Sequence, residues 1–205
     1  MVATSTNIGL NHLAAARGAW LVFEDEAGFS MPPPQAKTWS RRGHTPVVKV
    51  RGRSRRRISI AALTCYKAGE RSRLIYRPRK DDDRRDGRKS FSWRDYRDPL
   101  IAVHQQLGGP IVVVWDNLNV HKAGGLREFA ASRDWLTIYY LPPYAPDLNP
   151  VEGIWSLPRR GWLSKVAFTT PEHLIQRIGR GLRHIQYRPR LIDGCLAETG
   201  LTINP

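Results

Sequence analysis

The stretch PIVVVWDN, residues 110–117, has the composition of one short buried strand. Four apolar residues, three of them valine, follow Pro110 without any polar alternation. A continuous β-branched run of this kind is typical of a strand that is covered on both faces, as the central strands of an α/β sheet are. The polar residues Asp116 and Asn117 would then follow the carboxyl end of a central strand.

Apolar runs that end at glycine, proline or basic turns predict further strands around this one. The predicted strands cover residues 20–23, 47–50, 58–66, 73–79 and 135–141. Helices are predicted where apolar residues recur at helical spacing or where a capping residue opens a segment. They cover residues 90–107, with a kink at Pro99, and then 124–132, a segment that begins after Asn149, 169–185 and 189–197.

The order of these elements predicts the fold class. Three or four strands come first, and then helix, strand, helix, strand and further helices, which predicts an antiparallel meander joined to a βαβ unit. The result is an α/β protein that has a mixed sheet with helices on both faces. A length of 205 residues suits one domain, which we place at residues 18–197, between an N-terminal lead-in, 1–17, and a C-terminal tail, 198–205.

The positive charge is concentrated in one part of the chain. The formal net charge is +15, and residues 41–89 alone hold 18 Lys and Arg against 5 Asp and Glu. Such a block favours a polyanionic partner, most often nucleic acid, and the alternative is an arginine-rich solubilising surface. The candidates for phosphate contacts are, in order of preference, Arg53, Arg55, Arg56, Arg57, Arg159 and Arg160.

The composition disfavours membrane and secreted proteins. No run approaches the roughly 18 to 20 apolar residues that span a bilayer, and no secretory signal opens the sequence. Cys65 and Cys195 lie far apart and form no CxxC pair, so we expect reduced, buried thiols. We therefore expect a cytoplasmic, nucleoid-associated protein with no membrane partner.

Two aspartates follow strands that are expected to be neighbours in the sheet. Asp25 follows the strand at 20–23, and Asp116 follows the strand quoted first. Carboxylates at the ends of neighbouring strands can converge on one crevice, and acids that directly follow buried runs are costly to leave unpaired. Glu24 and Glu26 should point to the face opposite to Asp25, because side chains alternate along a strand.

A proline-rich segment, LPPYAPDLNPVEGIW at 141–155, leads to a third carboxylate, Glu152. Asn149 is suited to cap the helix that follows, and Pro150 to occupy its first turn. Glu152 could serve this cap alone, by returning a hydrogen bond to Asn149 in a capping box. The prolines favour another role, because fixed φ angles place the start of the helix rigidly, as a metal ligand requires.

Asp25, Asp116 and Glu152, with no Cys or His cluster nearby, form an all-oxygen donor set. Such a set suits Mg²⁺ or Mn²⁺ rather than Zn²⁺. Two such ions about 4 Å apart can activate an attacking hydroxyl and stabilise the leaving oxygen of a phosphodiester. Together with the basic block, the three acids predict metal-dependent chemistry on nucleic acid.

Three motifs of the sequence resemble the signatures of the mariner superfamily of DDE transposases, in particular its bacterial insertion-sequence branch. They are EDEAGF at 24–29, VVVWDNLNVH at 112–121 and YAPDLNPVEGIW at 144–155. The resemblance runs from about residue 18 to about residue 195. It implies that Asp25, Asp116 and Glu152 are the catalytic residues and the metal ligands. The 35 residues between Asp116 and Glu152 are close to the family's usual spacing.

The resemblance also implies a fold, a reaction and partners. The fold is the RNase H-like domain of retroviral integrases, with a mixed five-stranded sheet. The reaction is DNA cleavage at transposon ends with two Mg²⁺ or Mn²⁺ ions per site. The freed 3′-hydroxyl then attacks target DNA, without a covalent protein–DNA intermediate. A homodimer or larger assembly is expected in the active complex.

Members of this family carry N-terminal helix-turn-helix modules that read the transposon ends, and we find none ahead of Asp25. Two expectations follow. The chain is a catalytic domain that works with a helix-turn-helix protein from an upstream reading frame, or it is a truncated, catalytically inactive DNA-binding remnant or regulator. A structure-specific nuclease on the same fold is a third alternative.

Four residues near the three acids have expected roles of their own. Asn117 and His121 either contact a bound phosphate or form plain turn structure. Asp147 is expected to form a turn, and Trp155 to anchor its helix in the core.

Overall fold

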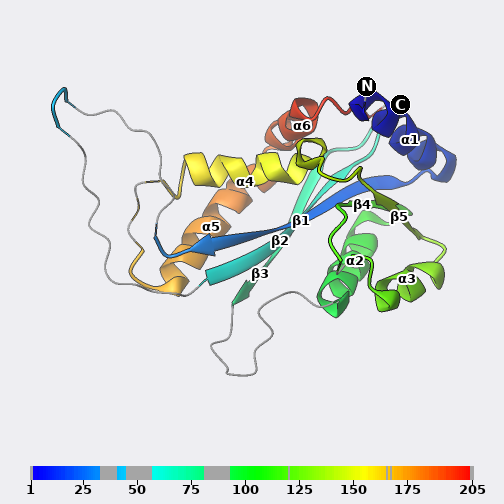
Figure 1. The fold of residues 1–205 in the computed structure, drawn as a ribbon, viewed down its shortest axis with the longest axis horizontal. Helices are drawn as coiled ribbons and strands as arrows, with labels where there is room; N and C mark the ends of the chain where they lie inside the picture. The colour runs from blue at the N-terminus through cyan, green and yellow to red at the C-terminus, as the bar shows by residue number, and fades with distance from the viewer. Residues whose placement is uncertain are drawn as a thin grey trace.

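Five strands of the described chain form one mixed sheet (Figure 1). The computed structural model describes residues 2–32, 41–44, 57–80, 93–119, 121–164, 166 and 168–203. The strands are β1 (Trp20–Ser30), β2 (Arg57–Tyr66), β3 (Arg73–Lys80), β4 (Ile111–Trp115) and β5 (Leu136–Tyr140). Their order across the sheet is β3-β2-β1-β4-β5. The first three in sequence pair antiparallel, and β1, β4 and β5 pair parallel, which confirms the predicted meander joined to a parallel unit. The predicted strand at 47–50 lies outside the described residues.

The first strand, β1, is longer than the sequence predicts. The apolar run indicates a strand over 20–23, whereas β1 continues through three acids to Ser30. The continuation has a partner, because β1 pairs with β2 over its whole length from Leu21 and Asp25 lies opposite Ala62. Ladder hydrogen bonds therefore outweigh the low strand propensity of the acids. Asp25 lies in the middle of β1, so its predicted place at the strand's end is wrong.

The parallel register between β1 and β4 places two aspartates side by side at one edge. Phe23 pairs with Val114 in the last step of this ladder. Asp25 and Asp116 each come two residues after that pair, and β4 ends at Trp115. The two carboxylates therefore lie just beyond the end of β4, where β1 continues without a paired strand on its β4 side.

Helices cover both faces of the sheet, which confirms the predicted arrangement (Figure 1). The side of α4, α5 and α6 is opposite to the side of α2 and α3. The bounds are α2 (Trp93–Leu107), α3 (Gly124–Ala131), α4 (Pro150–Arg160), α5 (Pro171–Gln186) and α6 (Pro189–Glu198). The predicted caps are present: Asn149 accepts a hydrogen bond from the backbone of Val151, and Thr170 from that of His173. Helix α2 includes Pro99 and continues to its predicted end.

Side chains of β4 alternate between two separate cores. Val112 and Val114 pack into the core beneath α4, α5 and α6. Ile111, Val113 and Trp115 pack into the core beneath α2 and α3. All five are buried, so the strand is covered on both faces, as its continuous apolar run predicts.

Helix α1 (Val2–Arg17) lies in the N-terminal lead-in, for which no helix or strand was predicted. Three consecutive alanines, 14–16, favour this conformation. Leu10 is buried in the core on the α4 side, and the Asn11 side chain donates a hydrogen bond to the carbonyl of Thr202. The two ends of the described chain therefore lie side by side (Figure 1).

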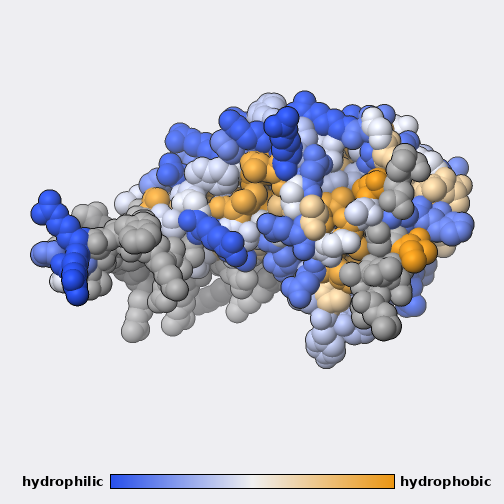
Figure 2. All heavy atoms as spheres, turned by 90° about the horizontal axis from the view of Figure 1, so that it is seen from above, coloured by the Kyte–Doolittle hydropathy of each residue, from blue (hydrophilic) through white to orange (hydrophobic). Residues whose placement is uncertain are grey.

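The surface in Figure 2 is mostly hydrophilic at its margins, with smaller hydrophobic areas toward the middle. Cys65 and Cys195 are free and buried, as predicted. Of the helices in the described part of the chain, none combines the length and the hydrophobicity that a bilayer crossing requires.

Candidate active site

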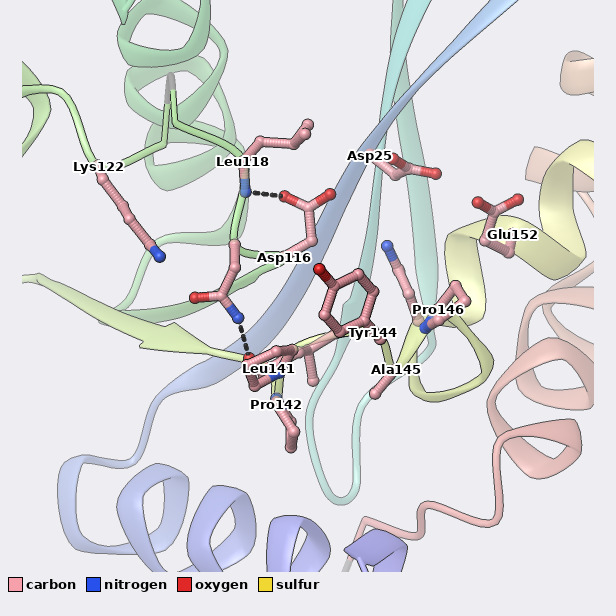
Figure 3. A pocket seen from close by; sticks show the side chains of 13 residues that line it. Asp25, Asp116, Leu118, Lys122, Leu141, Pro142, Tyr144, Ala145, Pro146 and Glu152 are labelled. Atoms are coloured by element: carbon pink, nitrogen blue, oxygen red, sulfur yellow. Dashed lines mark hydrogen bonds between the residues drawn. The ribbon is translucent and has the colours of Figure 1, made fainter.

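Asp25, Asp116 and Glu152 line one pocket, although they lie far apart in the sequence. The pocket has a volume of about 470 Å³. Asp25 comes from the middle of β1, Asp116 from the residue after β4, and Glu152 from the first turn of α4. Figure 3 shows the three carboxylates directed toward the same space, with Asp25 between the other two.

The Asp25 carboxylate is held from the α4 side of the sheet. Trp155 Nε1 donates a hydrogen bond to Asp25 Oδ2 at 3.0 Å. Trp155 is itself buried and makes an edge contact with the ring of Phe29. The predicted core anchor of α4 therefore also fixes one oxygen of the pocket.

The Asp116 carboxylate is held from the opposite face. His121 Nδ1 lies 2.7 Å from Asp116 Oδ1, and the backbone N–H of Leu118 donates to the same oxygen at 3.1 Å. The buried His121 ring stacks on Trp115 and meets the edge of Tyr96, with both centroid distances 4.8 Å. His121 is not among the residues that line the pocket. It lies behind Asp116, where it orients the carboxylate.

Asn117 connects the end of β4 to the proline-rich segment. Its side-chain Nδ2 donates to the carbonyl of Leu141 at 2.6 Å, and the residue also lines the pocket. This bond joins residues 24 positions apart, so it is a tertiary contact and not part of a turn, and a phosphate contact of Asn117 stays a prediction.

Glu152 does not complete a capping box. The backbone N–H of Asn149, which a capping glutamate would bind, already donates to the carbonyl of Pro146 at 2.8 Å. The Asn149 side chain accepts from Val151, so the cap is made without the glutamate. Glu152 is exposed and lines the pocket instead.

The pocket concentrates negative charge. Burial, and then repulsion by Glu152, raises the pKa of Asp25 from 3.8 to about 7, with a smaller contribution from Asp116. At Asp116, partial burial acts to raise the pKa, but hydrogen bonds from His121 and the backbone of Leu118 lower it below its usual value. The two aspartates therefore titrate in different ranges. A divalent cation would relieve the repulsion that raises the pKa of Asp25.

The carboxylates of Asp25, Asp116 and Glu152 suit a hard cation that two of them would bind together. Among the residues that the structure describes, no group of three or more His, Cys, Asp or Glu side chains is arranged to hold one ion. Asp25, however, experiences the charge of both Glu152 and Asp116, and it lies between them in Figure 3. Pairs of carboxylates that share Asp25 are the arrangement that the geometry favours.

Glu24 and Glu26 lie on the face away from the pocket, as the alternation along β1 predicts. Trp115 Nε1 donates to Glu24 Oε2 at 2.6 Å, and the Tyr96 hydroxyl donates to Glu26 Oε2 at 3.2 Å. Glu24 is buried, and its Oε2 lies 3.6 Å from His121 Nε2. Burial, and then repulsion by Asp25, raises the pKa of Glu24 well above its usual value. Glu24, Trp115 and His121 thus form a sealed cluster, which was not predicted from the sequence.

The sequence profile of the DDE superfamily endonucleases matches residues 20–175, which is well over half of the chain and includes all three acids. The chain belongs to the DDE superfamily of endonucleases. The predicted DDE family is therefore confirmed, and the mariner superfamily with its bacterial insertion-sequence branch stays a prediction.

Solved structures of the same fold come from a mariner transposase. The Mos1 mariner paired-end complex with Mn is 17% identical, with a TM-score of 0.59, over 99% of this chain and 63% of that chain. The catalytic domain of Mos1 mariner transposase is 15% identical, with a TM-score of 0.52, over 98% of this chain and 94% of that chain. These likenesses confirm the predicted RNase H-like fold.

This DDE chain matches a shorter stretch of one bacterial protein. The uncharacterized protein y4pE/y4sA of Sinorhizobium fredii (strain NBRC 101917 / NGR234) is 40% identical over 68 residues, which is 33% of this chain and 47% of that protein. The chain thus spans less than two thirds of the first Mos1 chain, and the match to y4pE/y4sA spans about half of that relative.

The predicted DNA contacts of this chain are described only in part. Arg53, Arg55 and Arg56 lie outside the described residues, and Arg57 is the first residue of β2. Arg159 and Arg160 are exposed in the last turn of α4, where the Arg159 guanidinium lies 5.6 Å from the centroid of the Phe29 ring. Neither Arg159 nor Arg160 is among the residues that line the pocket.

Sequence reasoning missed three residues of the pocket lining. Lys122, Leu118 and Tyr144 all line the pocket, and Lys122 helps to lower the pKa of Asp116. The lysine follows the second motif directly, and Tyr144 opens the third motif, so their positions beside the acids were the available signal.

Proposed function

We propose that this chain is the catalytic domain of a DDE transposase that cleaves DNA at transposon ends and joins the freed 3′-hydroxyl to target DNA. The observation that carries the proposal is the single pocket in which Asp25, Asp116 and Glu152 meet. The raised pKa of Asp25 supports it, because a carboxylate destabilised by burial and by Glu152 has a high demand for a cation. Membership of the DDE superfamily supplies the reaction class.

Two Mg²⁺ or Mn²⁺ ions are proposed per site, with Asp25 as a ligand of both. One ion would be shared with Asp116 and the other with Glu152, in keeping with the two repulsions that Asp25 experiences. Mos1 paired-end complexes were crystallised with Mn and with Mg. When bound, such ions lower the pKa of an attacking hydroxyl and stabilise the leaving oxygen of a phosphodiester.

The residues around the acids hold them in place and complete the site. The indole of Trp155 fixes Asp25, and His121 fixes Asp116. Fixed side chains reduce the reorganisation that the reaction requires. Lys122 places one positive charge in the pocket lining, where a phosphate of the substrate would bind.

DNA is the proposed partner, both as transposon end and as target. The structures that share the fold include a Mos1 paired-end complex with its left transposon end. The basic block at 41–89 supports the same partner through its charge. We propose a homodimer or larger assembly in the active complex, and recognition of the transposon ends by helix-turn-helix modules. Action on DNA implies a cytoplasmic, nucleoid-associated protein.

The decisive experiment incubates the protein with DNA that carries the terminal repeats flanking its reading frame, in Mg²⁺ or Mn²⁺. Wild type should give nicked ends and strand-transfer products, and Asp116→Ala should reduce both at least about 100-fold. Asp134→Ala, which removes an exposed aspartate before β5, is the matched control and should behave as wild type. If the DNA stays uncut with both wild type and Asp116→Ala, the proposal is overturned. Cleavage without joining would indicate a nuclease.

An inactive DNA-binding remnant is the second candidate. It is favoured by the absence, within the described residues, of three side chains arranged around one ion. Melting temperatures separate the two candidates. An intact site should be stabilised by Mn²⁺ in wild type but not in Asp25→Asn, whereas a remnant with a distorted site should show no metal-linked rise in either.

A further inference from the structure

Tyr144 adopts a backbone conformation that is unfavourable for its side chain. Its φ is +57°, and it is the one non-glycine residue with positive φ in the described part of the chain. In this left-handed region the Cβ atom crowds the following carbonyl, so glycine or asparagine is usually found there. Prolines at 142, 143 and 146 surround it and restrict the backbone on both sides.

The Tyr144 ring gains no packing in return for this conformation. Its relative exposure is 103%, so the ring buries no surface against the protein. Four large hydrophobic side chains are exposed among the described residues, and two of them, Leu118 and Tyr144, line the pocket of the three acids. Backbone strain combined with an exposed ring at such a place is a mark of function rather than of folding.

The lining of the pocket also includes a group of apolar residues. This part of the lining consists of Leu118, Leu141 and residues 142–146, and it adjoins Asp116, because the backbone N–H of Leu118 donates to that carboxylate. Figure 3 shows the Tyr144 ring projecting from the proline-rich segment beside Asp116. A phosphate held at the acids would therefore place its own sugar and base toward this part of the lining.

We propose that Tyr144, supported by Leu118, is a stacking platform for an unpaired nucleobase beside the phosphate that is cut. This inference rests on the proposed function, since the acids define where that phosphate lies. An exposed ring can stack on any base, because every base has a π-face. Each amide of the lining uses one group in a backbone hydrogen bond: Asn117 Nδ2 donates to the carbonyl of Leu141, and Asn149 Oδ1 accepts from the N–H of Val151.

Three variants separate the ring from the backbone conformation. Tyr144→Phe keeps the ring, Tyr144→Ala removes it, and Tyr144→Gly removes it while also relieving the left-handed strain. Tyr187→Ala is the matched control, because Tyr187 is also exposed, at 69%, but lies at the end of α5 and outside the pocket lining. None of the four substitutions removes a buried side chain, so all four proteins should fold.

The experiment measures quenching of a single 2-aminopurine in an unpaired oligonucleotide, with Ca²⁺ in place of Mg²⁺. Wild type, Tyr144→Phe and Tyr187→Ala should quench the probe alike. Tyr144→Ala and Tyr144→Gly should lose the quenching and bind about 5- to 150-fold more weakly. Equal quenching and affinity in wild type and Tyr144→Ala would overturn the inference, as would the absence of quenching in wild type.

Cleavage assays run beside the quenching assay keep the two proposals distinguishable. If wild type quenches through Tyr144 but cuts no DNA, the platform stands and the transposase function fails. If wild type cuts DNA and Tyr144→Ala cuts and quenches equally well, the function stands and the platform fails.

Discussion

The two faces of β1 give neighbouring carboxylates opposite surroundings. On one face Asp25 opens into a pocket with Glu152 and Asp116. On the other face Glu24 is enclosed by aromatic side chains beneath α2. Burial raises the pKa of both acids, and each accepts one indole N–H, from Trp155 on the pocket face and from Trp115 on the sealed face.

The contrast shows that a raised pKa alone does not identify a catalytic acid. Glu24 has no open route to a cation, and its neutral form suits a dry surrounding. Asp25 differs because a second carboxylate, Glu152, repels it across a pocket that a cation can enter. Access and like-charge neighbours, rather than burial, distinguish the functional face.

The largest difference between the faces should appear when each indole donor is removed. Trp115→Phe leaves the carboxylate of Glu24 without its donor in a dry core, so we expect the free energy of unfolding to fall by about 3 kcal/mol. Trp155→Phe also truncates a buried indole, but it leaves Asp25 beside a pocket that water can enter, so a smaller loss of about 2 kcal/mol is expected. Urea denaturation of both variants measures the difference. Equal losses would show that the two carboxylates are equally sealed.

The next largest loss of stability is expected when a tightly packed glycine on each face is replaced by alanine. A Cβ added at Gly153 would lie 2.9 Å from Cys195 Sγ, and one at Gly125 would lie 2.8 Å from the Trp93 ring. Gly153→Ala and Gly125→Ala should each cost about 2 kcal/mol of stability through overpacking. Only Gly153→Ala, which pushes on α4 beside Glu152, should also weaken Mn²⁺ binding, as measured by calorimetry.

A second substitution checks the origin of this effect. Cys195→Ala removes the sulfur that the new methyl group meets, so it should restore part of the stability and the Mn²⁺ affinity of Gly153→Ala. If Gly125→Ala weakens Mn²⁺ binding equally, the pocket responds to general loosening and not to the position of α4.

Local patterns in the sequence were sufficient to predict the order of the described strands and the elements that carry the three acids. A continuous apolar run predicts β4 as a central strand, and a polar residue after it predicts where Asp116 emerges. The length of β1 was beyond such reasoning, since the acids of this strand are held by pairing with β2, a contact between distant residues. Tertiary pairing overrode local propensity there.

The sealed cluster and the shape of the pocket were not predictable for the same reason. His121 meets Glu24 across more than ninety positions of sequence, and no spacing rule connects them. The left-handed φ of Tyr144 was equally hidden, because tyrosine is not a residue that signals this conformation. Both features depend on how separate segments meet in the folded chain.

His121 links the two faces, and its two ring nitrogens can be tested separately. Its Nδ1 contacts Asp116, and its Nε2 faces Glu24. The amide of asparagine can replace the first contact and that of glutamine the second. His121→Gln should therefore weaken Mn²⁺ binding about tenfold, as loss of a residue that orients a ligand does, while His121→Asn should stay close to wild type. The reverse ranking would place the important contact on the Glu24 side.

A change of slope in stability against pH is also expected. The pKa of Asp25 rises from 3.8 to about 7 on folding, so between these values the folded protein holds a proton that the unfolded chain has lost. The stability of the metal-free protein should therefore fall as the pH rises from about 4 to about 7, and level off above. Glu24 contributes in the same direction above its usual pKa of 4.5.

Divalent cations distinguish the two contributions, because a cation competes with the proton on Asp25 but cannot reach Glu24. The stabilisation by Mn²⁺ in thermal melts should be near zero at pH 5 and grow through pH 7. Asp25→Asn should abolish this growth, and Glu24→Gln should reduce only the metal-independent slope. A stabilisation by Mn²⁺ that is constant with pH in wild type would mean that Asp25 binds no metal. The acids of the pocket face would then be structural, as Glu24 is.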